Sequence, residues 1–549
     1  MPEQQDAIES GRQHHAAGRL DQAEAIYQGI LAADPDHAEA LALLGLLYYQ
    51  MNRWADATAV LRRAVAANGD SEECVFNLGL ALGAAENWAE AAEAFQNSIK
   101  LSADYAPAYN GLGNALRNLR RYPESVAAHQ RAVALRPESA GFWSNLGIAI
   151  QATDRYPESI SAYRKSLAIN PESPEGWCNL ANALWMNGEL EESAKASRRA
   201  LEIRPDFPEA YSNLGIVLHN LGDYAAAREA FERGLQLQPE SANLRYNFSM
   251  LLLLQAEFRR GWQGYEWRRR VPGFRSSVPQ FSQPMWDGGE LSGRTILIYT
   301  EQGFGDAIHF ARYLPSVAQR GGKIILRCHS ALIRLFSTID GVNTVVPMDG
   351  RLPEFDFHCP LLSLPYVLDE DMPWHGPYLH GDPRTGEKFA DLLRAAGTKL
   401  KVGLIWSGRG HLKGRSIPPE MLGGLANERV QFYSLQVDRA SVDGPPAGLN
   451  LIDAGSRLGD FADTAALMEQ LDLVVSIDTA AAQLAGALAR PVWTLLKFVP
   501  DWRWLLARED SPWYPTMRLF RQTRSGRWEE PISRLAQELR ILAGERGSS

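Results

Sequence analysis

The spacing of apolar positions changes once along the chain. Up to about residue 270, small and large apolar residues recur in one phase every 34 positions. This period predicts a series of helical hairpins, because a fixed repeat of 20 to 50 residues is typical of stacked supersecondary units. After Phe258 the period is lost, and from Arg294 short apolar runs alternate with helical stretches. The pattern therefore predicts a repeat half followed by an α/β half.

Four kinds of residue keep the same phase in the repeat half. They are the prolines Pro35, Pro137, Pro171, Pro205 and Pro239, the glycines Gly45, Gly79, Gly113, Gly147 and Gly215, the small residues Ala23, Ala57, Ala91, Ser125, Ser159, Ser193 and Ala227, and the large residues Trp54, Trp88, Tyr122, Tyr156 and Tyr224. Glycine and the small residues allow two helices to approach closely, and proline ends a helix because it cannot continue the interior. Gly69 and Ala103 stand where other copies have proline, and Ala181 stands where they have glycine. These departures from the pattern are interpreted as ordinary sequence drift.

This pattern resembles the tetratricopeptide repeat (TPR) family. The W-x2-L-G, alanine and proline positions of that family are matched, for example by Trp143 to Gly147 followed by Pro171, over about residues 3–270 and in seven to eight copies. One hairpin cannot bury its own apolar faces, so stacked units form a solenoid with a concave surface. The resemblance implies a TPR superhelix over residues 1–270.

An asparagine precedes the repeat leucine in five of seven copies. These residues are Asn77, Asn145, Asn179, Asn213 and Asn247. Two interpretations stand at equal weight: an amide ladder that holds an extended peptide, as in the O-GlcNAc transferases that this half resembles, or bonds between neighbouring hairpins. An amide carries both donors and an acceptor and suits either role. We take Asn145, Asn179, Asn213 and Asn247 as candidate acceptor-binding residues.

The second half contains five strand-like runs. They are Thr295–Tyr299, Lys323–Arg327, Val402–Trp406, Asp472–Ser476 and Pro491–Leu495, with a helix expected at Ala307–Gln319. Alternating strands and helices predict parallel sheets. A break near residues 382–401 predicts two such sheets with a cleft between them.

Three loops that follow predicted strands carry candidate ligand-binding residues, because α/β proteins bind ligands at the carboxyl ends of their strands. The first loop, residues 300–306, contains Gly303, Gly305 and Asp306. The glycines permit a tight turn beside a ligand. Asp306 stands at a helix start, where it is either a catalytic base or a helix cap.

The second loop, residues 406–416, offers Ser407, Arg409, Lys413 and Arg415 on a glycine-rich segment. Clustered cations suit a diphosphate, and a solvent-exposed loop is the alternative at comparable weight.

The third loop, residues 476–486, begins a helix at Asp478, Thr479 and Ala480. The unpaired N–H groups of a helix start make this a candidate phosphate site.

Together the three loops resemble the TPR-containing GT-B glycosyltransferases, whose catalytic part is akin to bacterial heptosyltransferases. The matching stretches are residues 301–306, 405–408, 415–417, 460–468, 476–493 and 501–515. The resemblance implies that Asp306 is the general base, that the second and third loops hold the donor diphosphate, and that the reaction is inverting and independent of metal. Glu301 and His309, which could also pair with Asp306, are reserve acid–base candidates. Gln483 stands where relatives often carry histidine, which leaves altered or lost activity open.

The predicted fold class is therefore α followed by α/β: a TPR solenoid, then a two-lobed GT-B domain of double Rossmann-like form. We place the solenoid at residues 1–270, a linker at 271–290, an acceptor-side lobe at 291–385 and a nucleotide-sugar lobe at 386–549.

The composition disfavours some classes of partner and some cellular locations. The net charge of −9 disfavours a nucleic-acid partner, which requires a basic surface. Four cysteines without a CxxC pair fit a reducing compartment, no secretory signal is visible, and no apolar stretch reaches the roughly 20 residues needed to span a bilayer. We expect a cytoplasmic protein.

The expected function is transfer of a sugar from a nucleotide-sugar donor to a hydroxyl of a protein acceptor recruited by the solenoid, with no further cofactor. Two alternatives remain: a non-catalytic TPR scaffold with a degenerate transferase domain, and a transferase that acts on lipid or polysaccharide. The sequence identifies neither the donor nor the acceptor.

Overall fold

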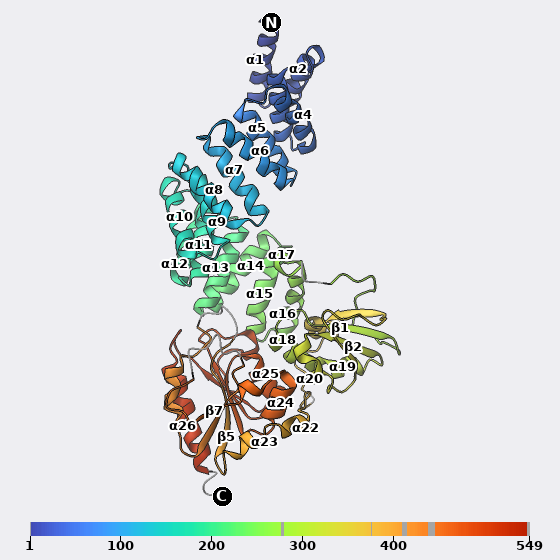
Figure 1. Ribbon diagram of the computed structural model, residues 1–549, viewed down its shortest axis with the longest axis vertical. Coiled ribbons are helices and arrows are strands. Elements are labelled where there is room, and N and C mark those ends of the chain that lie inside the picture. The colour runs from blue at the N-terminus through green and yellow to red at the C-terminus, as the bar shows by residue number, and fades with distance from the viewer. Residues whose placement is uncertain (1, 276–278, 375, 409–413, 438–444, 546–549) are drawn as a thin grey trace. The chain divides into compact units, whose positions relative to one another are not determined.

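The computed structural model describes residues 2–275, 279–374, 376–408, 414–437 and 445–545 (Figure 1). It divides into two compact units, Met1–Leu218 and His219–Ser549. The second unit thus contains the last helices of the repeat half together with the whole α/β half. The boundaries that we place at residues 270, 290 and 385 stay predictions.

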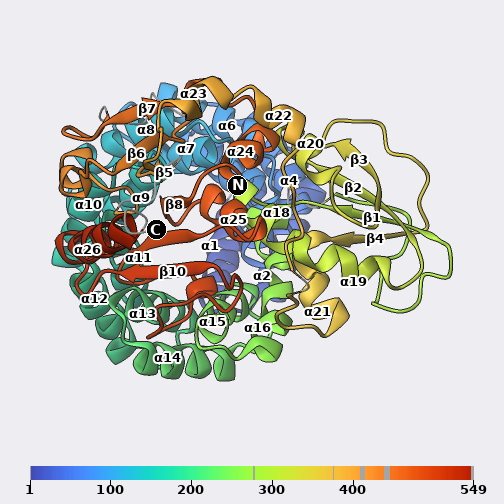
Figure 2. The same cartoon turned by 90° about the horizontal axis from the view of Figure 1, so that it is seen from below.

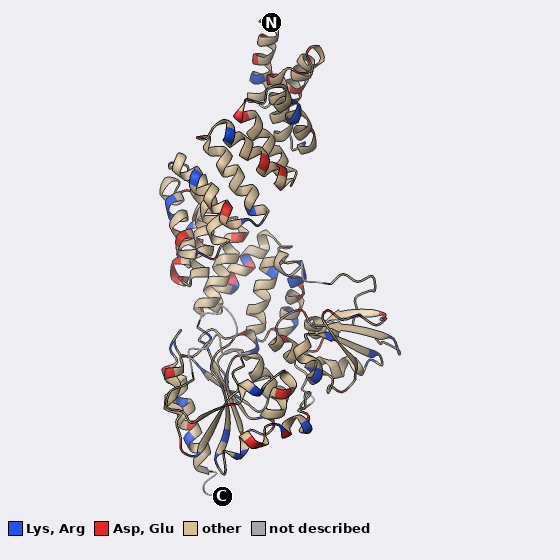
Figure 3. Ribbon diagram, viewed as in Figure 1, with Lys and Arg blue, Asp and Glu red and all other residues tan. Residues whose placement is uncertain are grey.

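The first unit is a solenoid of helical hairpins, which confirms the predicted repeats. Its helices are α1 (Pro2–Ala16), α2 (Leu20–Ala33), α3 (Ala38–Gln50), α4 (Trp54–Ala67), α5 (Glu72–Ala84), α6 (Trp88–Leu101), α7 (Ala106–Asn118), α8 (Tyr122–Leu135), α9 (Ala140–Gln151), α10 (Tyr156–Ile169), α11 (Pro174–Asn187), α12 (Leu190–Ile203) and the greater part of α13 (Pro208–Leu221). Acidic and basic residues are mixed along these helices (Figure 3).

Four of the repeat glycines, Gly45, Gly79, Gly113 and Gly147, each lie against a large side chain 16 residues later. A methyl group on Gly79 would lie 2.6 Å from the ring of Phe95, and one on Gly147 would lie 2.6 Å from that of Tyr163. No side chain fits there without repacking, because protein interiors are close-packed. In the hairpin of α11 and α12 both positions change together: Ala181 replaces the glycine and Ser197 the large residue. The larger Ala181 is therefore compensated by the smaller Ser197. Its departure from glycine is a paired change and not the random drift that the sequence suggested.

The small-residue column has a second role where it is serine. The buried hydroxyls of Ser125, Ser159 and Ser193 donate to the carbonyl oxygens of Gly113, Gly147 and Ala181, at 2.7, 2.9 and 2.6 Å. Each bond joins the two helices of one hairpin. Alanine and serine therefore interchange in this column because both are small and a serine can satisfy its own hydroxyl.

The second unit begins with helices and continues into two parallel sheets. The helices are α14 (Tyr224–Leu237), α15 (Ala242–Leu254) and α16 (Phe258–Tyr265). The first sheet has the order β3-β2-β1-β4, with β1 (Thr295–Tyr299), β2 (Lys323–Cys328), β3 (Val342–Pro347) and β4 (Phe357–Pro360). The second has the order β10-β9-β8-β5-β6-β7, with β5 (Leu400–Ile405), β6 (Val430–Ser434), β7 (Leu451–Asp453), β8 (Leu473–Ile477), β9 (Val492–Leu496) and β10 (Met517–Arg521). The pairings between these strands are all parallel, which confirms the predicted parallel sheets.

All five predicted strands are present within two residues of their expected ends. The strands that sequence reasoning missed are short or polar: β4 has four residues, β7 has three, and β6 buries Gln431. The helix expected over residues 307–319 begins earlier, as α18 (Phe304–Phe310), and is interrupted before α19 (Leu314–Ala318). Pro315 lacks the N–H that a continuous helix would use at that point.

The second sheet is covered on both faces (Figure 2). On one face α26 (Glu529–Glu545) packs over Leu404 and Val475, and on the other α24 (Phe461–Met468) and α25 (Ala480–Ala487) pack over Val474. Burial on both faces explains why these strands read as continuous apolar runs. The remaining short helices are α17 (Pro272–Arg275), α20 (Ile333–Phe336), α21 (Leu364–Leu368), α22 (Pro383–Glu387) and α23 (Ala390–Arg394).

The aromatic-rich segment that follows the repeats packs into the core of the second unit. Trp262 of α16 is buried, with its ring perpendicular to that of Trp502 at 5.1 Å. Arg268 is also buried, forms ion pairs with Glu266 and Glu301 at 2.7 Å each, and donates to Ser363 Oγ. The segment is therefore part of the α/β core, and its charge is neutralised inside that core.

Candidate functional site

One cleft of about 920 Å³ lies within the second unit. Its walls are formed by residues 302–306 after β1, 405–408 after β5, 435–437 after β6, 478–481 after β8 and 497–503 after β9, so both sheets present the carboxyl ends of their strands to it. Helical residues complete the wall, including His219, Tyr246, Met250 and Tyr265. The cleft occupies the place where parallel α/β sheets bind ligands.

The residues predicted from the three separate loops meet in this cleft. Those that line it are Gly303, Gly305, Asp306, Ser407, Arg415, Asp478, Thr479 and Ala480. Arg409 and Lys413, the remaining predicted residues of the second loop, lie outside the described residues. The first and third loops approach closely, because a methyl group on Gly305 would lie 3.5 Å from the Cα of Ala480.

Asp306 lies in the first turn of α18 and forms an ion pair with Arg503. The Arg503 side chain is only 9% exposed, and its other terminal nitrogen donates to Asp501 Oδ1 at 2.8 Å. Burial opposes the charge on Arg503, but the two carboxylates hold its pKa above the ordinary value. A permanent cation therefore bridges two acids at the cleft wall.

Sequence reasoning missed Arg503. It stands in the stretch 501–515 that carries the resemblance, but 197 residues separate it from Asp306. No spacing rule connects two residues so far apart, and only the fold brings them together.

The start of α25 is open to an anionic ligand. Thr479, its N-cap residue, makes no capping bond and instead pairs its hydroxyl with Ser476 Oγ at 3.0 Å. The first N–H groups of the helix therefore have no side-chain cap, and the helix dipole favours negative charge at that end. Burial raises the pKa of the neighbouring Asp478, whereas Arg415, 3.3 Å away, opposes that shift.

The second loop is held to the end of β6 by Gln436. The Ser407 N–H donates to Gln436 Oε1 at 3.2 Å, and Gln436 Nε2 donates back to the Ser407 carbonyl oxygen at 2.9 Å. The Ser407 hydroxyl pairs with Ser416 Oγ at 3.2 Å. Gln436, which sequence reasoning did not single out, thus fixes the backbone of Ser407 beside the cleft.

The reserve candidates have other partners. His309 does not pair with Asp306 as its spacing suggested: its Nδ1 lies 3.2 Å from Gln483 Oε1 and 3.3 Å from the Tyr514 hydroxyl. Burial, reinforced by the nearby Arg312, lowers the pKa of His309 well below its ordinary value, so this ring is neutral. Glu301 is occupied by Arg268. Gln483 lies between this network and the cleft, which it also lines.

Two of the candidate asparagines bond to the preceding hairpin. Asn145 Nδ2 donates to Asn110 Oδ1 at 3.0 Å, and Asn213 Nδ2 donates to the Cys178 carbonyl oxygen at 3.2 Å. These contacts fit the interpretation that the amides hold neighbouring repeats together. All four candidates, including Asn179 and Asn247, are half-buried in the described structure.

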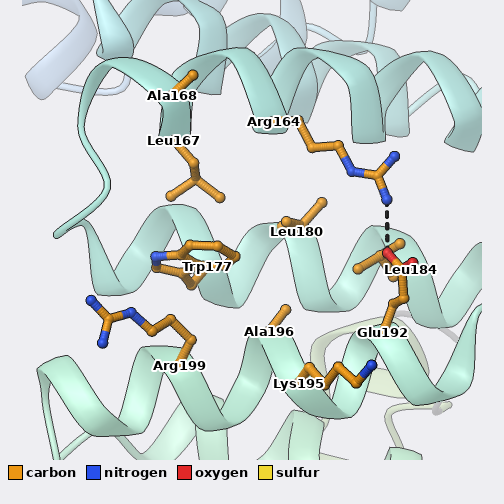
Figure 4. Close-up of a pocket in the computed structure, with 10 residues that line it drawn as sticks. All are labelled: Arg164, Leu167, Ala168, Trp177, Leu180, Leu184, Glu192, Lys195, Ala196 and Arg199. Atoms are coloured by element: carbon orange, nitrogen blue, oxygen red, sulfur yellow. Dashed lines mark hydrogen bonds and ion pairs between the residues drawn. The ribbon is translucent and has the colours of Figure 1, made fainter.

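A second concavity, of about 510 Å³, lies among α10, α11 and α12 in the first unit (Figure 4). Trp177, Leu180 and Leu184 form its apolar floor. On its rim Arg164 donates to Glu192 at 2.8 Å. No sequence motif pointed to this concavity.

The parts of the chain that the structure describes contain no group of three or more His, Cys, Asp or Glu side chains placed to hold a metal ion. They also contain no helix with the length and apolar character needed to cross a bilayer.

Comparison with known proteins finds a curated relative, several solved structures and matches to sequence models of repeats. A curated relative, protein FlbA of Caulobacter vibrioides, is 28% identical over 341 residues, which cover 55% of this chain and 56% of FlbA. The chain therefore spans little more than half the length of that relative.

Three solved structures each match about a third of this chain. YrrB, described as a TPR protein with an unusual peptide-binding site, is 18% identical and covers 34% of this chain and 95% of its own, with a TM-score of 0.30. A MamA structure is 25% identical over 31% of this chain and 94% of its own, with a TM-score of 0.29. PilF of Pseudomonas aeruginosa is 21% identical and covers 38% of this chain and 95% of its own, with a TM-score of 0.34.

Sequence models described as tetratricopeptide repeat or TPR repeat match residues 14–74, 76–140, 152–188 and 178–242. These matches agree with the helical hairpins and with the 34-residue period of the sequence. The N-terminal half of the chain carries tetratricopeptide repeats.

Proposed function

We propose that this protein is a glycosyltransferase of the two-lobed GT-B type, which transfers a sugar from a nucleotide-sugar donor to a hydroxyl of a protein acceptor. The observation that carries the proposal is the convergence of three loops, distant in sequence and belonging to two different parallel sheets, on one cleft. Each loop was chosen because it follows a predicted strand and carries glycines or charged side chains, and the sequence alone did not require all three to line the same cleft.

In the proposed reaction Asp306 acts as the general base. The acceptor oxygen attacks the anomeric carbon of the donor, its proton passes to the Asp306 carboxylate, and the bond from that carbon to the diphosphate oxygen breaks. Inversion at the anomeric carbon follows from a single displacement. Arg503 and Asp501 support this role, because the ion pair keeps the Asp306 carboxylate oriented at the wall of the cleft.

The leaving diphosphate needs compensation for its charge. The uncapped start of α25 supplies N–H groups, and Arg415 supplies a cation at the same end of the cleft. Donors that are already in place when charge develops stabilise a transition state without reorganisation. We expect Lys413, which lies outside the described residues, to add a second cation.

A polypeptide acceptor is supported by the helical part of the cleft wall. Tyr246 and Met250 belong to α15, and Tyr265 closes α16, so the last repeat helices face the cleft directly. Apolar and hydroxyl-bearing side chains of this kind suit a peptide segment. A lipid or polysaccharide acceptor is the weaker alternative, because it gives the repeats no role.

The scaffold alternative remains for two reasons. Asp306 is already engaged by Arg503, and Gln483 stands where relatives in the family that this half resembles often carry histidine. A scaffold would neither bind nucleotides in the cleft nor modify an acceptor.

The direct test is intact-mass analysis of candidate acceptors co-expressed with the full chain. The expected result is an acceptor mass increased by one or more sugar residues. Asp306→Asn should lower the rate of modification by about 10²- to 10⁴-fold, because it removes a positioned base. The modified fraction of the acceptor should fall accordingly. Asp340→Asn, an exposed position that does not line the cleft, is the matched control and should leave the modification unchanged. Equal modification by Asp306→Asn would remove that residue from the mechanism.

A further inference from the structure

The chain that leaves the cleft wall after Arg503 is strained. Leu505 has φ 50° and ψ −167°, and Ala507 has φ 48°. Residues with side chains rarely adopt positive φ, and the conformation of Leu505 is close to a region used almost only by glycine. Such residues persist only when their surroundings hold them, so a restraint on this turn is expected nearby.

Arg521, the last residue of β10, supplies that restraint. Its Nε donates to the Arg508 carbonyl oxygen at 2.7 Å, its Nη1 donates to that of Leu505 at 3.1 Å, and its Nη2 donates to that of Trp504. One planar guanidinium thus bonds three carbonyl groups that flank both strained residues. Only arginine carries enough donors in a fixed fork to do this.

The buried guanidinium of Arg521 has its charge compensated by the carbonyl oxygens of the turn. Burial, with a further contribution from Arg508, lowers the pKa of the Arg521 guanidinium to about 10. The side chain is therefore still charged at neutral pH, and its charge is met by carbonyl oxygens. Charge-assisted bonds of this kind are stronger than those between neutral groups.

The turn is tied at both ends to fixed parts of the second unit. Before it, Trp513 Nε1 donates to the Arg503 carbonyl oxygen at 2.5 Å. After it, the Leu519 N–H donates to the Glu509 carbonyl oxygen at 2.7 Å. Between these ties, the Arg521 guanidinium is the group that bonds the carbonyl oxygens of Trp504, Leu505 and Arg508. The turn continues directly from Arg503, whose side chain reaches Asp306 and Asp501.

We propose that Arg521 is a positioning residue for the cleft: by holding the turn at residues 504–508 it keeps Arg503 against Asp306 and Asp501. Arg521 does not line the cleft and acts only through Arg503. Its consequence for catalysis rests on the proposed function, whereas its effect on the turn and on α18 does not.

The test is hydrogen exchange of the full chain, read on peptides that cover residues 503–508 and 304–310. Arg521→Lys keeps the charge, but one ammonium cannot reach three carbonyls, and Arg521→Met removes the charge as well. Both should speed exchange in the turn by about tenfold, and exchange at the start of α18 by a smaller factor, through the loosened pair with Asp306. Arg518→Met, on the same strand and paired with Glu538, is the matched control and should change neither peptide.

A second variant tests the strain itself. Ala507 is exposed, so Ala507→Gly removes only a methyl group while allowing the positive φ. Added to Arg521→Lys, it should restore part of the protection of the turn. Unchanged exchange in both Arg521 variants would overturn the proposal. Faster exchange in the turn with no change in α18 would also overturn it, because Arg521 would then be structural only.

Catalysis is a separate arm of the test. Once a donor is known, Arg521→Lys should lower kcat by about tenfold with little change in the donor KM. The variant should disturb the position of Asp306 through Arg503 and leave the diphosphate site unchanged. Lower kcat supports the proposal, and a KM effect alone counts against it. A wild-type chain that neither binds nor turns over any donor would refute the proposed function, while the exchange results would still decide the role of Arg521.

Discussion

The repeat hairpins and the cleft are built in opposite ways. In the hairpins one contact, glycine against a large side chain 16 residues later, is made again and again, as with Gly79 and Phe95. In the cleft each contact occurs once, between residues as distant as Asp306 and Arg503. The charges differ too: ion pairs of the first unit such as Arg164 with Glu192 are exposed, whereas Arg268 and Arg503 are buried.

This difference shows where single changes should matter. A solenoid shares its stability among neighbouring repeats, so a local fault is felt mainly by the adjacent units. The α/β unit has buried charges whose partners cannot be replaced by water. Removing one partner of such a pair leaves an uncompensated charge, which costs far more than the loss of a surface pair.

The largest expected effect on stability comes from Arg268→Met. It leaves Glu266 and Glu301 without their buried partner and should lower the free energy of unfolding by about 3–5 kcal/mol. Arg164→Met, in an exposed pair of the first unit, is the matched control and should cost less than about 1 kcal/mol. Urea unfolding of the two variants measures both, and similar losses would erase the contrast between the units.

The next effect concerns pH and lies in the repeats. Burial, with a smaller contribution from Arg117, lowers the pKa of His129 from 6.5 to about 4. Between those values the unfolded chain binds a proton that the folded chain does not, so stability is full above about pH 6.5 and falls as the pH drops towards 4. The loss amounts to about 3 kcal/mol.

His129→Phe should remove that part of the pH dependence, since Phe95 fills the equivalent position one repeat earlier. Asn110, the ring's hydrogen-bond partner, still receives a bond from Asn145. The measurement is the difference in unfolding free energy between variant and wild type at pH 7 and pH 4.5. A difference that does not change with pH would show that His129 titrates normally in the folded chain.

The smallest effect tests the repeated contact. Gly147→Ala forces a methyl group against Tyr163 and should destabilise the chain by about 1–2 kcal/mol, because overpacking outweighs the better helix propensity of alanine. Gly141→Ala, in the same helix α9, has open space around the new methyl and should not destabilise. Equal effects in denaturant unfolding would mean that the glycine column is not a packing requirement.

Sequence alone predicted the repeats well and the cleft in part. The hairpins could be predicted because their contacts recur at a fixed spacing, as the columns of Gly147 and Ser159 show. The strands β1 and β8 were predicted because burial on both faces makes them apolar throughout. The short edge strand β7 gives no such signal.

The loops of the cleft were found because glycines and charges follow predicted strands. Arg503, Gln436 and Arg521 were not found, since their importance lies in partners far away in the chain. The suggested pairing of His309 with Asp306 was also wrong. Helical spacing cannot show that His309 bonds to Gln483, which is 174 residues away in the chain. Periodic features are thus visible in one sequence, whereas contacts made once require the fold.

The central claim, that the cleft is a nucleotide-sugar site, is tested most directly by calorimetric titration of the full chain with a panel of nucleoside mono- and diphosphates. We predict that one nucleotide binds, that Arg415→Ala weakens its affinity about 10- to 100-fold through loss of a charged hydrogen bond, and that the exposed Arg429→Ala has no effect. Failure of every nucleotide to bind the wild-type chain, or equal affinity in Arg415→Ala, would contradict the claim.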